Sequence, residues 1–263
     1  MRTLLCLFLL TLCAVPAMAQ KCPVPKILTF QVEKQISRDT LGFTQGLEMD
    51  GSTLLEGTGN MFGDTRINRI DPATGKVTQL MSAGKRYFGE GITVFGDRIY
   101  QMSWREGQVF VFDRQLRPLG QFPNPRDGWG LTNDGTRLIA SDGSSRLFFL
   151  SPQDFSTLGS VRVTRNGRYV DNLNELEYVG GAVWANLFED WDVVRINPAT
   201  GCVEASADLR PLRSRVSNAE RKYIDSDANF VPNGIAHDAA TGQFILTGKN
   251  WKTLFFGRFS EVN

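Results

Sequence analysis

Five short motifs in the sequence begin with residues of different types at equivalent positions: Gln45, Glu90, Trp129, Asn174 and Asn233. The residues that follow are alike, with glycine next in four motifs and leucine or isoleucine third in all five. We assign the repeated glycine and aliphatic positions to packing and the variable first position to function. The alternative is that these side chains only satisfy backbone groups around a water-filled channel.

Glu90 and Lys249 are the two candidates for catalysis. Phe88 lies two residues before Glu90 and could shield it from water, which would raise the pKa of the carboxyl group and suit it to proton transfer. Lys249 follows the strand-like segment 244–247 and could pair with Glu90 or stabilise an oxyanion. The alternatives to a catalytic role are that Glu90 forms a structural ion pair and that Lys249 is a solvated residue at the end of a strand.

Several aromatic residues near these positions could line a pocket, although an aromatic residue in a strand most often belongs to the core. They are Phe43, Phe88, Trp104, Trp129 and Phe188.

The spacing of the five motifs predicts the fold that positions these side chains. Their first residues lie 45, 39, 45 and 59 apart, and each motif opens a hairpin that a second hairpin follows. Four strands per unit of roughly 40–45 residues is typical of a propeller blade. We therefore predict an all-β, five-bladed β-propeller with four-stranded blades, in which the N-terminal segment 26–36 closes the ring as the outer strand of the last blade.

In such a blade the first strand begins, and the second ends, at the same mouth of the central channel. The motif residues should therefore meet Trp104, Phe188 and Lys249 at one mouth. The 59-residue spacing places a long connection, 210–230, on this face. We expect this connection to act as a flap whose basic residues meet peptide substrates; they are Arg213, Arg215, Arg221 and Lys222.

Composition excludes several other chemistries. The chain has one histidine, His237, so a histidine-based zinc site or a Ser-His-Asp triad is not expected. No glycine-rich phosphate loop of standard spacing is present. With 29 basic and 28 acidic residues, the chain lacks the basic excess that nucleic acid or an anionic membrane would require.

The N-terminal residues indicate export. Arg2, the apolar run 4–15 and the small residues around Ala19 predict a cleaved signal peptide over residues 1–19. Residues 20–263 would form a single domain in the periplasm or outside the cell, with a monomer as the default. Cys22 and Cys202 remain after cleavage, and in an oxidising compartment they are expected to form a disulfide, the alternative being two buried thiols.

Six stretches in order along the chain resemble the plant and bacterial type of glutaminyl-peptide cyclotransferase (glutaminyl cyclase). They are Phe43-Thr44-Gln45-Gly46-Leu47, Phe88-Gly89-Glu90-Gly91-Ile92-Thr93, Gly128-Trp129-Gly130-Leu131-Thr132, Leu173-Asn174-Glu175-Leu176-Glu177, Asn233-Gly234-Ile235-Ala236 and Thr247-Gly248-Lys249-Asn250-Trp251. Each stretch alone is a weak signal, but six in order are specific.

The resemblance implies a five-bladed propeller that converts the N-terminal glutamine of peptides or proteins to pyroglutamate and releases ammonia, without a metal or other cofactor. It assigns the general acid/base role to Glu90. Gln45, Asn174 and Lys249 would be polar site residues, and Phe43, Phe88, Trp104 and Trp129 an aromatic wall. This chain has Phe188 where the family often has tryptophan, and Trp191 could compensate for the missing indole.

Two other function classes remain open at this stage. A non-catalytic propeller could bind peptides or glycans at the same mouth, but such a module needs no titratable pair. A hydrolase of the lactonase kind would need a metal held by several carboxylates, for which only Glu90 and Glu175 are available.

Overall fold

The computed structural model describes residues 22–59 and 65–262. Strands make up most of this part of the chain, and its only helices are the short 3₁₀ helix η1 (Arg210–Ser214) and helix α1 (Asn218–Ile224). None of the described helices has the length and apolar character needed to cross a membrane. The expected signal peptide, residues 1–19, lies outside the described residues.

The strands follow one another in antiparallel sets, as the repeated hairpins predicted. The first three sets are four-stranded sheets, and the first of them contains β2 (Thr44–Asp50), β3 (Thr53–Thr58), β4 (Thr65–Ile70) and β5 (Val77–Gly84). The second contains β6 (Gly89–Phe95), β7 (Arg98–Ser103), β8 (Gln108–Asp113) and β9 (Pro118–Pro123). The third contains β10 (Leu131–Asn133), β11 (Leu138–Ala140), β12 (Arg146–Leu150) and β13 (Thr157–Arg162). The small hairpin β14 (Thr164–Arg165) and β15 (Arg168–Tyr169) follows.

The remaining strands form one eight-stranded sheet. It contains β16 (Leu173–Val179), β17 (Ala182–Leu187), β18 (Asp192–Ile196), β19 (Val203–Asp208), β20 (Pro232–Asp238), β21 (Gln243–Gly248), β22 (Thr253–Glu261) and β1 (Lys26–Ser37). As expected, the N-terminal strand β1 pairs with β22. It also pairs in parallel with β19 at residues 26–28, and this unforeseen contact joins the two sets into one sheet.

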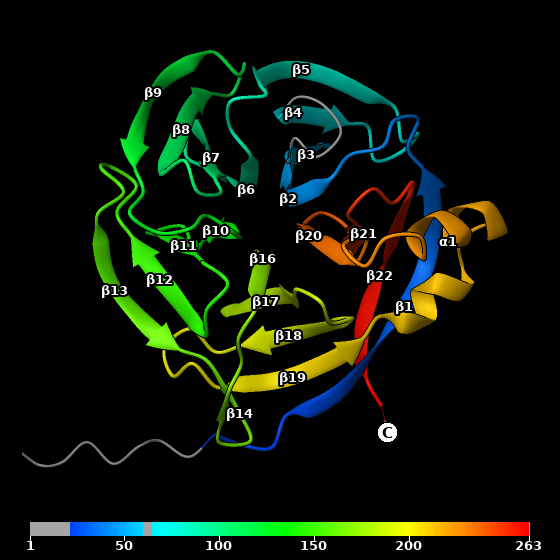
Figure 1. The fold of residues 1–263 in the computed structure, drawn as a ribbon. Helices are drawn as coiled ribbons and strands as arrows, with labels where there is room; N and C mark the ends of the chain where they lie inside the picture. The colour runs from blue at the N-terminus through cyan, green and yellow to red at the C-terminus, as the bar shows by residue number, and fades with distance from the viewer. Residues whose placement is uncertain (1–21, 60–64, 263) are drawn as a thin grey trace, which may run out of the picture.

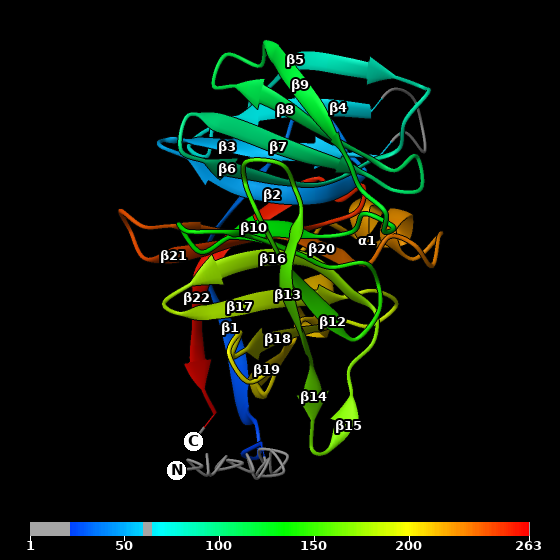
Figure 2. The same cartoon turned by 90° about the vertical axis from the view of Figure 1, so that its left-hand side faces the viewer.

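The sheets are arranged around a centre, with β2, β6, β10, β16 and β20 innermost (Figure 1). These five strands contact one another in a closed ring, because β2 touches both β6 and β20 while β10 and β16 complete the circle. In the side view the hairpin β14–β15 projects from the lower edge (Figure 2). The all-β prediction is thus confirmed.

Close packing of the innermost strands explains the motif glycines. A Cβ atom on Gly91 would lie 2.4 Å from the backbone nitrogen of Leu131, and one on Gly130 would lie 1.9 Å from the carbonyl oxygen of Asn174. Neither neighbour is a flexible side-chain end that could move aside. Farther from the centre, aliphatic side chains such as Leu55, Ile67 and Ile99 fill the space between adjacent sheets. The repeated glycine and aliphatic residues therefore serve packing.

The disulfide predicted between Cys22 and Cys202 is present and connects residues 180 positions apart in the sequence. Cys202 precedes β19, so the bond fastens the N-terminal segment next to the parallel β1–β19 pairing.

Candidate active site

A pocket of about 150 Å³ opens at one mouth of the ring. It is lined by Phe43, Gln45, Phe88, Glu90, Trp104, Trp129, Asn174, Phe188, Asn229 and Lys249. Nine of the ten residues that the sequence singled out therefore meet here, and Asn233 is the exception.

Hydrogen bonds between neighbouring strands explain why two sets of residues share this mouth. The backbone N–H of Trp104, after the end of β7, donates to the carbonyl oxygen of Phe88, just before β6, over 2.8 Å. The N–H of Lys249, after β21, likewise donates to Val231, just before β20, over 3.0 Å. In each case the end of the second strand lies beside the start of the first.

Irregular pairing within the innermost strands positions four of the polar residues. The register between first and second strands shifts across Gln45 in β2, Glu90 in β6, Asn174 in β16 and Asn233 in β20. Such a bulge bends its strand locally and redirects a side chain. The shift recurs in four of the five innermost strands, and three of the side chains within it, Gln45, Glu90 and Asn174, line the pocket.

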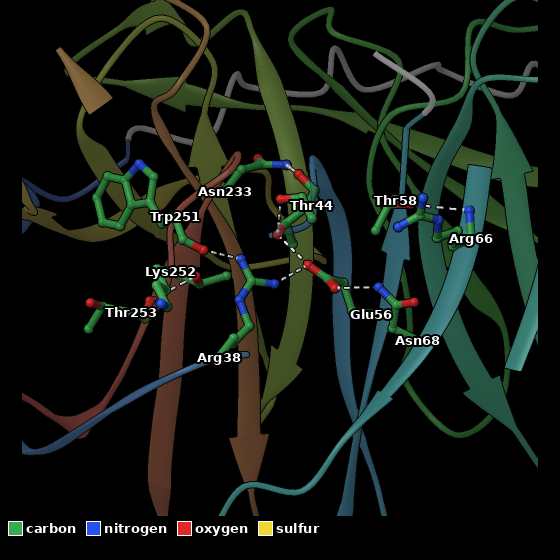
Figure 3. A network of polar contacts seen from close by, with 12 residues as sticks. Arg38, Thr44, Glu56, Thr58, Arg66, Asn68, Asn233, Trp251, Lys252 and Thr253 are labelled. Carbon is green, nitrogen blue, oxygen red and sulfur yellow. Dashed lines mark hydrogen bonds and ion pairs between the residues drawn. The ribbon is translucent and has the colours of Figure 1, made fainter. Parts of the chain in front are cut away.

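Asn233 lies behind Gln45 instead of lining the pocket. Its side-chain nitrogen donates to the carbonyl oxygen of Thr44 at 2.9 Å and to Oε1 of Gln45 at 3.2 Å. Figure 3 shows Asn233 bonded to Thr44. Because Oε1 of Gln45 accepts this bond, Nε2 of Gln45 is the atom that faces Glu90 and donates to its Oε1 at 3.4 Å.

Glu90 is 5 % exposed, and burial raises the pKa of its carboxyl group well above the ordinary value. The positive charge of Lys249 opposes this rise in pKa, whereas the negative charges of Glu106 and Asp127 add to it. A carboxyl group whose pKa is raised is a stronger base in its ionised form, which suits it to accept a proton from a substrate.

Lys249 is also buried, and loss of water lowers the pKa of its ammonium group to about 8, while Glu90 acts in the opposite direction. Its Nζ lies 4.5 Å from the ring centre of Phe188 and 5.2 Å from that of Phe43. Glu90 and Lys249 both line the pocket. The two charges therefore face a common space that a substrate can enter.

Aromatic rings form the walls of the pocket. Phe88 contacts the ring of Trp104 at 5.6 Å and the edge of Phe43 at 6.1 Å between centroids. On the other side Trp129 and Phe188 meet edge to face at 5.6 Å. Phe188 thus belongs to the aromatic wall of the pocket.

Trp191 does not replace the missing indole. Its ring packs against Trp251 at 5.4 Å, and it is not among the residues that line the pocket. The helical connection after β19 holds it there, because Arg213 lies over its outer face. The suggestion that Trp191 fills the gap beside Phe188 is therefore wrong.

Asn174 and Asn229 supply further polar groups. Oδ1 of Asn174 is buried and has no hydrogen-bond partner, so it is available to a donor on a substrate. Asn229 was not foreseen. It lies in the connection between β19 and β20, which has no counterpart in the other repeats, and its side-chain nitrogen donates to Asp227 at 2.9 Å.

The rest of this connection does not form the flap that was expected. Helix α1 lies outside the ring beside β1 (Figure 1). Glu220 fixes it there by accepting bonds from the backbone nitrogens of Lys252 and Thr253 at 2.8 and 2.9 Å. Leu212, Val216, Ile224 and Phe230 bury their side chains against the core. The four basic residues expected to meet substrate, Arg213, Arg215, Arg221 and Lys222, are not among the residues that line the pocket.

Glu175, the second candidate for a metal ligand, has both carboxylate oxygens engaged. They accept the backbone N–H groups of Leu47 at 3.0 Å and Ile235 at 2.8 Å, and thereby join β16 to β2 and β20. In the described part of the chain, no three His, Cys, Asp or Glu residues are grouped so that they could hold a metal ion.

The sequence profile of the family described as glutamine cyclotransferase matches residues 4–259. The chain belongs to the glutamine cyclotransferase family. It is 36 % identical over 233 residues to the glutaminyl-peptide cyclotransferase of Arabidopsis thaliana, a match that covers 88 % of this chain and 71 % of the plant protein. The crystal structure of Myxococcus xanthus glutaminyl cyclase superposes with a TM-score of 0.79 at 28 % identity, covering 91 % of this chain and all of the bacterial one. These matches within the glutamine cyclotransferase family agree with the resemblance of the six motifs.

Proposed function

We propose that this protein is a glutaminyl-peptide cyclotransferase, which converts the N-terminal glutamine of peptides or proteins to pyroglutamate and releases ammonia. The observation that carries the proposal is the buried Glu90, which faces Lys249 across an aromatic pocket in a chain of the glutamine cyclotransferase family. We further propose that the ring of strands is a five-bladed propeller and that residues 20–263 form one domain.

The reaction suits a small, preformed pocket. The α-amine of the substrate attacks the side-chain amide carbon of the same residue and closes a five-membered ring. A free α-amine has a pKa of about 7.7–8.0, so part of it is already a nucleophile near neutral pH. Because the attack is intramolecular, the main entropic task of the enzyme is to hold the glutamine side chain curled against its own amine.

Glu90 is assigned the proton transfers. The amine nitrogen loses a proton as the new C–N bond forms, and the carboxylate of Glu90 accepts it. The same group then gives the proton to the amide nitrogen, and the C–N bond to that nitrogen breaks so that ammonia leaves. One carboxyl group between two nitrogens serves both steps, and its raised pKa makes the carboxylate a stronger acceptor for the proton of the amine.

The oxygen of the attacked amide becomes negatively charged before ammonia leaves, and it needs donors. Lys249 is the charged donor in the pocket, and the amide groups of Gln45 and Asn174 are the neutral ones. The unpartnered Oδ1 of Asn174 is suited to accept a bond from the substrate amine. The rings of Phe43, Phe88, Trp104, Trp129 and Phe188 would exclude water, which would otherwise compete with the amine and yield glutamate.

The mechanism that we propose uses no metal ion, because every step is assigned to side chains of the pocket. The test is an ammonia-release assay on a short peptide beginning with glutamine, with and without a chelator. We expect equal rates and a product lighter by one ammonia. Complete loss of activity in chelator that zinc restores would overturn the metal-free mechanism.

The same assay tests the alternative of a non-catalytic module that binds peptides or glycans. If the wild-type protein binds a glutamine peptide and releases no ammonia, that alternative becomes the leading one. We also propose that the protein is periplasmic or secreted, which the disulfide supports because such bonds persist in oxidising compartments.

A further inference from the structure

A fully buried ion pair lies next to the pocket without lining it. Arg38, which follows β1, bonds through Nη1 to Oε1 of Glu56 in β3, and the two side chains are 0 % and 1 % exposed. The pair lies where the first sheet, β2–β5, meets the last strands, β20–β22 (Figure 3). The polar residues around it come from both sides of this boundary.

Arg38 holds the turn that carries Lys249. Its Nη2 donates to the carbonyl oxygen of Trp251, two residues after Lys249, and its backbone N–H donates to the carbonyl oxygen of Lys252 at 2.8 Å. Trp251 is itself fully buried, and its indole nitrogen donates to Phe230 at 2.8 Å. The turn 249–252 is therefore fastened to Arg38 at two points.

Glu56 holds the strand that carries Gln45. Oε1 of Glu56 accepts from the hydroxyl group of Thr44, the residue before Gln45, and its Oε2 accepts from Asn68 in β4 at 2.9 Å. Gly42 leaves room for this carboxylate, because a Cβ atom at position 42 would lie only 2.6 Å from Oε1 of Glu56. The carbonyl oxygen of Gly42 accepts from Asn250, which follows Lys249, at 2.8 Å.

We propose that Arg38 and Glu56 are positioning residues for the reaction: their ion pair fixes the turn that carries Lys249 relative to the strand that carries Gln45. A buried ion pair is a weak source of stability, since desolvation of both charges offsets much of their attraction. The pair can still fix the relative position of the two segments, because the planar guanidinium group of Arg38 bonds in set directions to the Glu56 carboxylate and to the turn at the same time. The inference rests on the proposed function.

Displacement of the turn would change the charges around Glu90. Four charged or polar groups act on this carboxyl group: Lys249 from β21, Gln45 from β2, Glu106 after β7 and Asp127 before β10. Lys249 is the cation among them. If Lys249 moves away, the negative charges of Glu106 and Asp127 dominate, and Glu90 retains its proton to higher pH.

The test replaces Arg38 by lysine, which keeps the positive charge but has one ammonium nitrogen in place of the planar fork that offers one nitrogen to Glu56 and another to Trp251. We expect kcat/KM to fall about tenfold or more, since a misplacement of about 1 Å in an active site can cost about 100-fold. We also expect the acidic limb of the kcat/KM profile to move to higher pH. Arg69→Lys is the control, because Arg69 in β4 pairs with Asp50 in β2 at 3.0 Å within the sheet that also contains Glu56, and Arg69 does not line the pocket.

A loss of stability alone would scale down the rate and leave the pH profile in place. Arg38→Lys and Arg69→Lys are therefore compared at equal folded fraction, measured by circular dichroism. The positioning role would be overturned if R38K kept the wild-type kcat/KM per folded molecule and the acidic limb of its kcat/KM profile stayed at the same pH. Glu56→Gln provides a second variant, and it should shift the limb in the same direction as R38K.

The positioning role can also be measured without turnover. A ¹³C-labelled lysine titration, with the Lys249 signal assigned through Lys249→Arg, reports the pKa of Lys249 directly. We expect this pKa to change in R38K and to stay the same in R69K. If wild-type protein releases no ammonia, the proposed function fails, and this titration still decides whether Arg38 positions Lys249.

Discussion

Nε2 of Gln45 donates to Oε1 of Glu90 at 3.4 Å, while Oε1 of Gln45 accepts from Asn233 at 3.2 Å. An amide side chain can turn over and exchange its donor and acceptor ends. The bond from Asn233 fixes the orientation in which the donor faces the carboxylate. Asn233 therefore acts on the site through Gln45.

Replacement of Asn233 by aspartate tests this relationship. An aspartate cannot donate to Oε1 of Gln45, so we expect the Gln45 amide to lose its fixed orientation and kcat to fall about 2–10-fold, the effect of one hydrogen bond between neutral groups. Gln45→Ala should reduce kcat similarly, and the double variant should be no worse than the single ones. Additive losses measured in this double-mutant cycle would contradict the coupling.

Replacement of Glu90 by glutamine should have the largest effect on the rate. Glutamine keeps the shape and the hydrogen bonding of the side chain but cannot accept the proton of the amine. General acid–base catalysis contributes about 10²–10⁴-fold, so kcat should fall by at least two orders of magnitude while KM changes little. Retention of more than about a tenth of the wild-type kcat would refute the role assigned to Glu90.

Replacement of Lys249 by methionine should move the acidic limb of the kcat/KM profile upward. Lys249 lowers the pKa of Glu90, so its removal raises that pKa, and the active carboxylate then appears only at higher pH. The rate on the plateau should fall as well, because an oxyanion donor is lost. A limb that stays in place while the plateau falls would indicate that Lys249 acts only as a donor.

Asn229 is the residue of the long connection that reaches the pocket, and Asp227 holds its side chain in place. We expect Asn229→Ala to raise KM for glutamine peptides about 2–10-fold, the cost of one hydrogen bond, with a smaller change in kcat. Lys222→Ala is the control from the same connection, because Lys222 is exposed and does not line the pocket. Equal KM values for both variants would exclude a substrate contact at Asn229.

Loss of the Cys22–Cys202 bond should lower stability and leave catalysis intact, because neither cysteine lines the pocket. For a loop of this length the chain-entropy model gives roughly 4–5 kcal/mol as an upper figure. A Cys22→Ser/Cys202→Ser double variant should therefore unfold at lower temperature with an unchanged kcat at 25 °C. Mass spectrometry of non-reduced mature protein should find the two cysteines linked, and alkylation of both would contradict the bond.

Repetition explains how much of the site could be predicted from the sequence. Glu90, Trp129 and Asn174 occupy one position in a recurring motif, so each could be placed relative to the others without knowledge of their contacts. Asn229 has no repeated counterpart, and no periodic signal marks it. The location of Asn233 behind Gln45 depends on the directions of two side chains, which spacing does not specify.

The same limit applied to the fold. The repeated hairpins predicted the antiparallel sets, because hairpin signals are local. The parallel pairing of Lys26 with Ala205 depends on two segments far apart in the chain, and nothing in either segment marks the other. Arg38 and Glu56 were overlooked for a similar reason, since a charged residue in a sequence looks the same whether it is solvated or paired in the core.

The double pairing of β1 also constrains the order of folding. Its partners, β19 and β22, lie far along the chain, so the first described strand can pair only after the last described ones have been made. Contacts of such long sequence separation form slowly, because closing a large loop costs conformational entropy before the hydrogen bonds that offset this cost can form. The three sheets from β2 to β13 use partners that are close in the sequence and can therefore form first, whereas closure of the ring waits for β22.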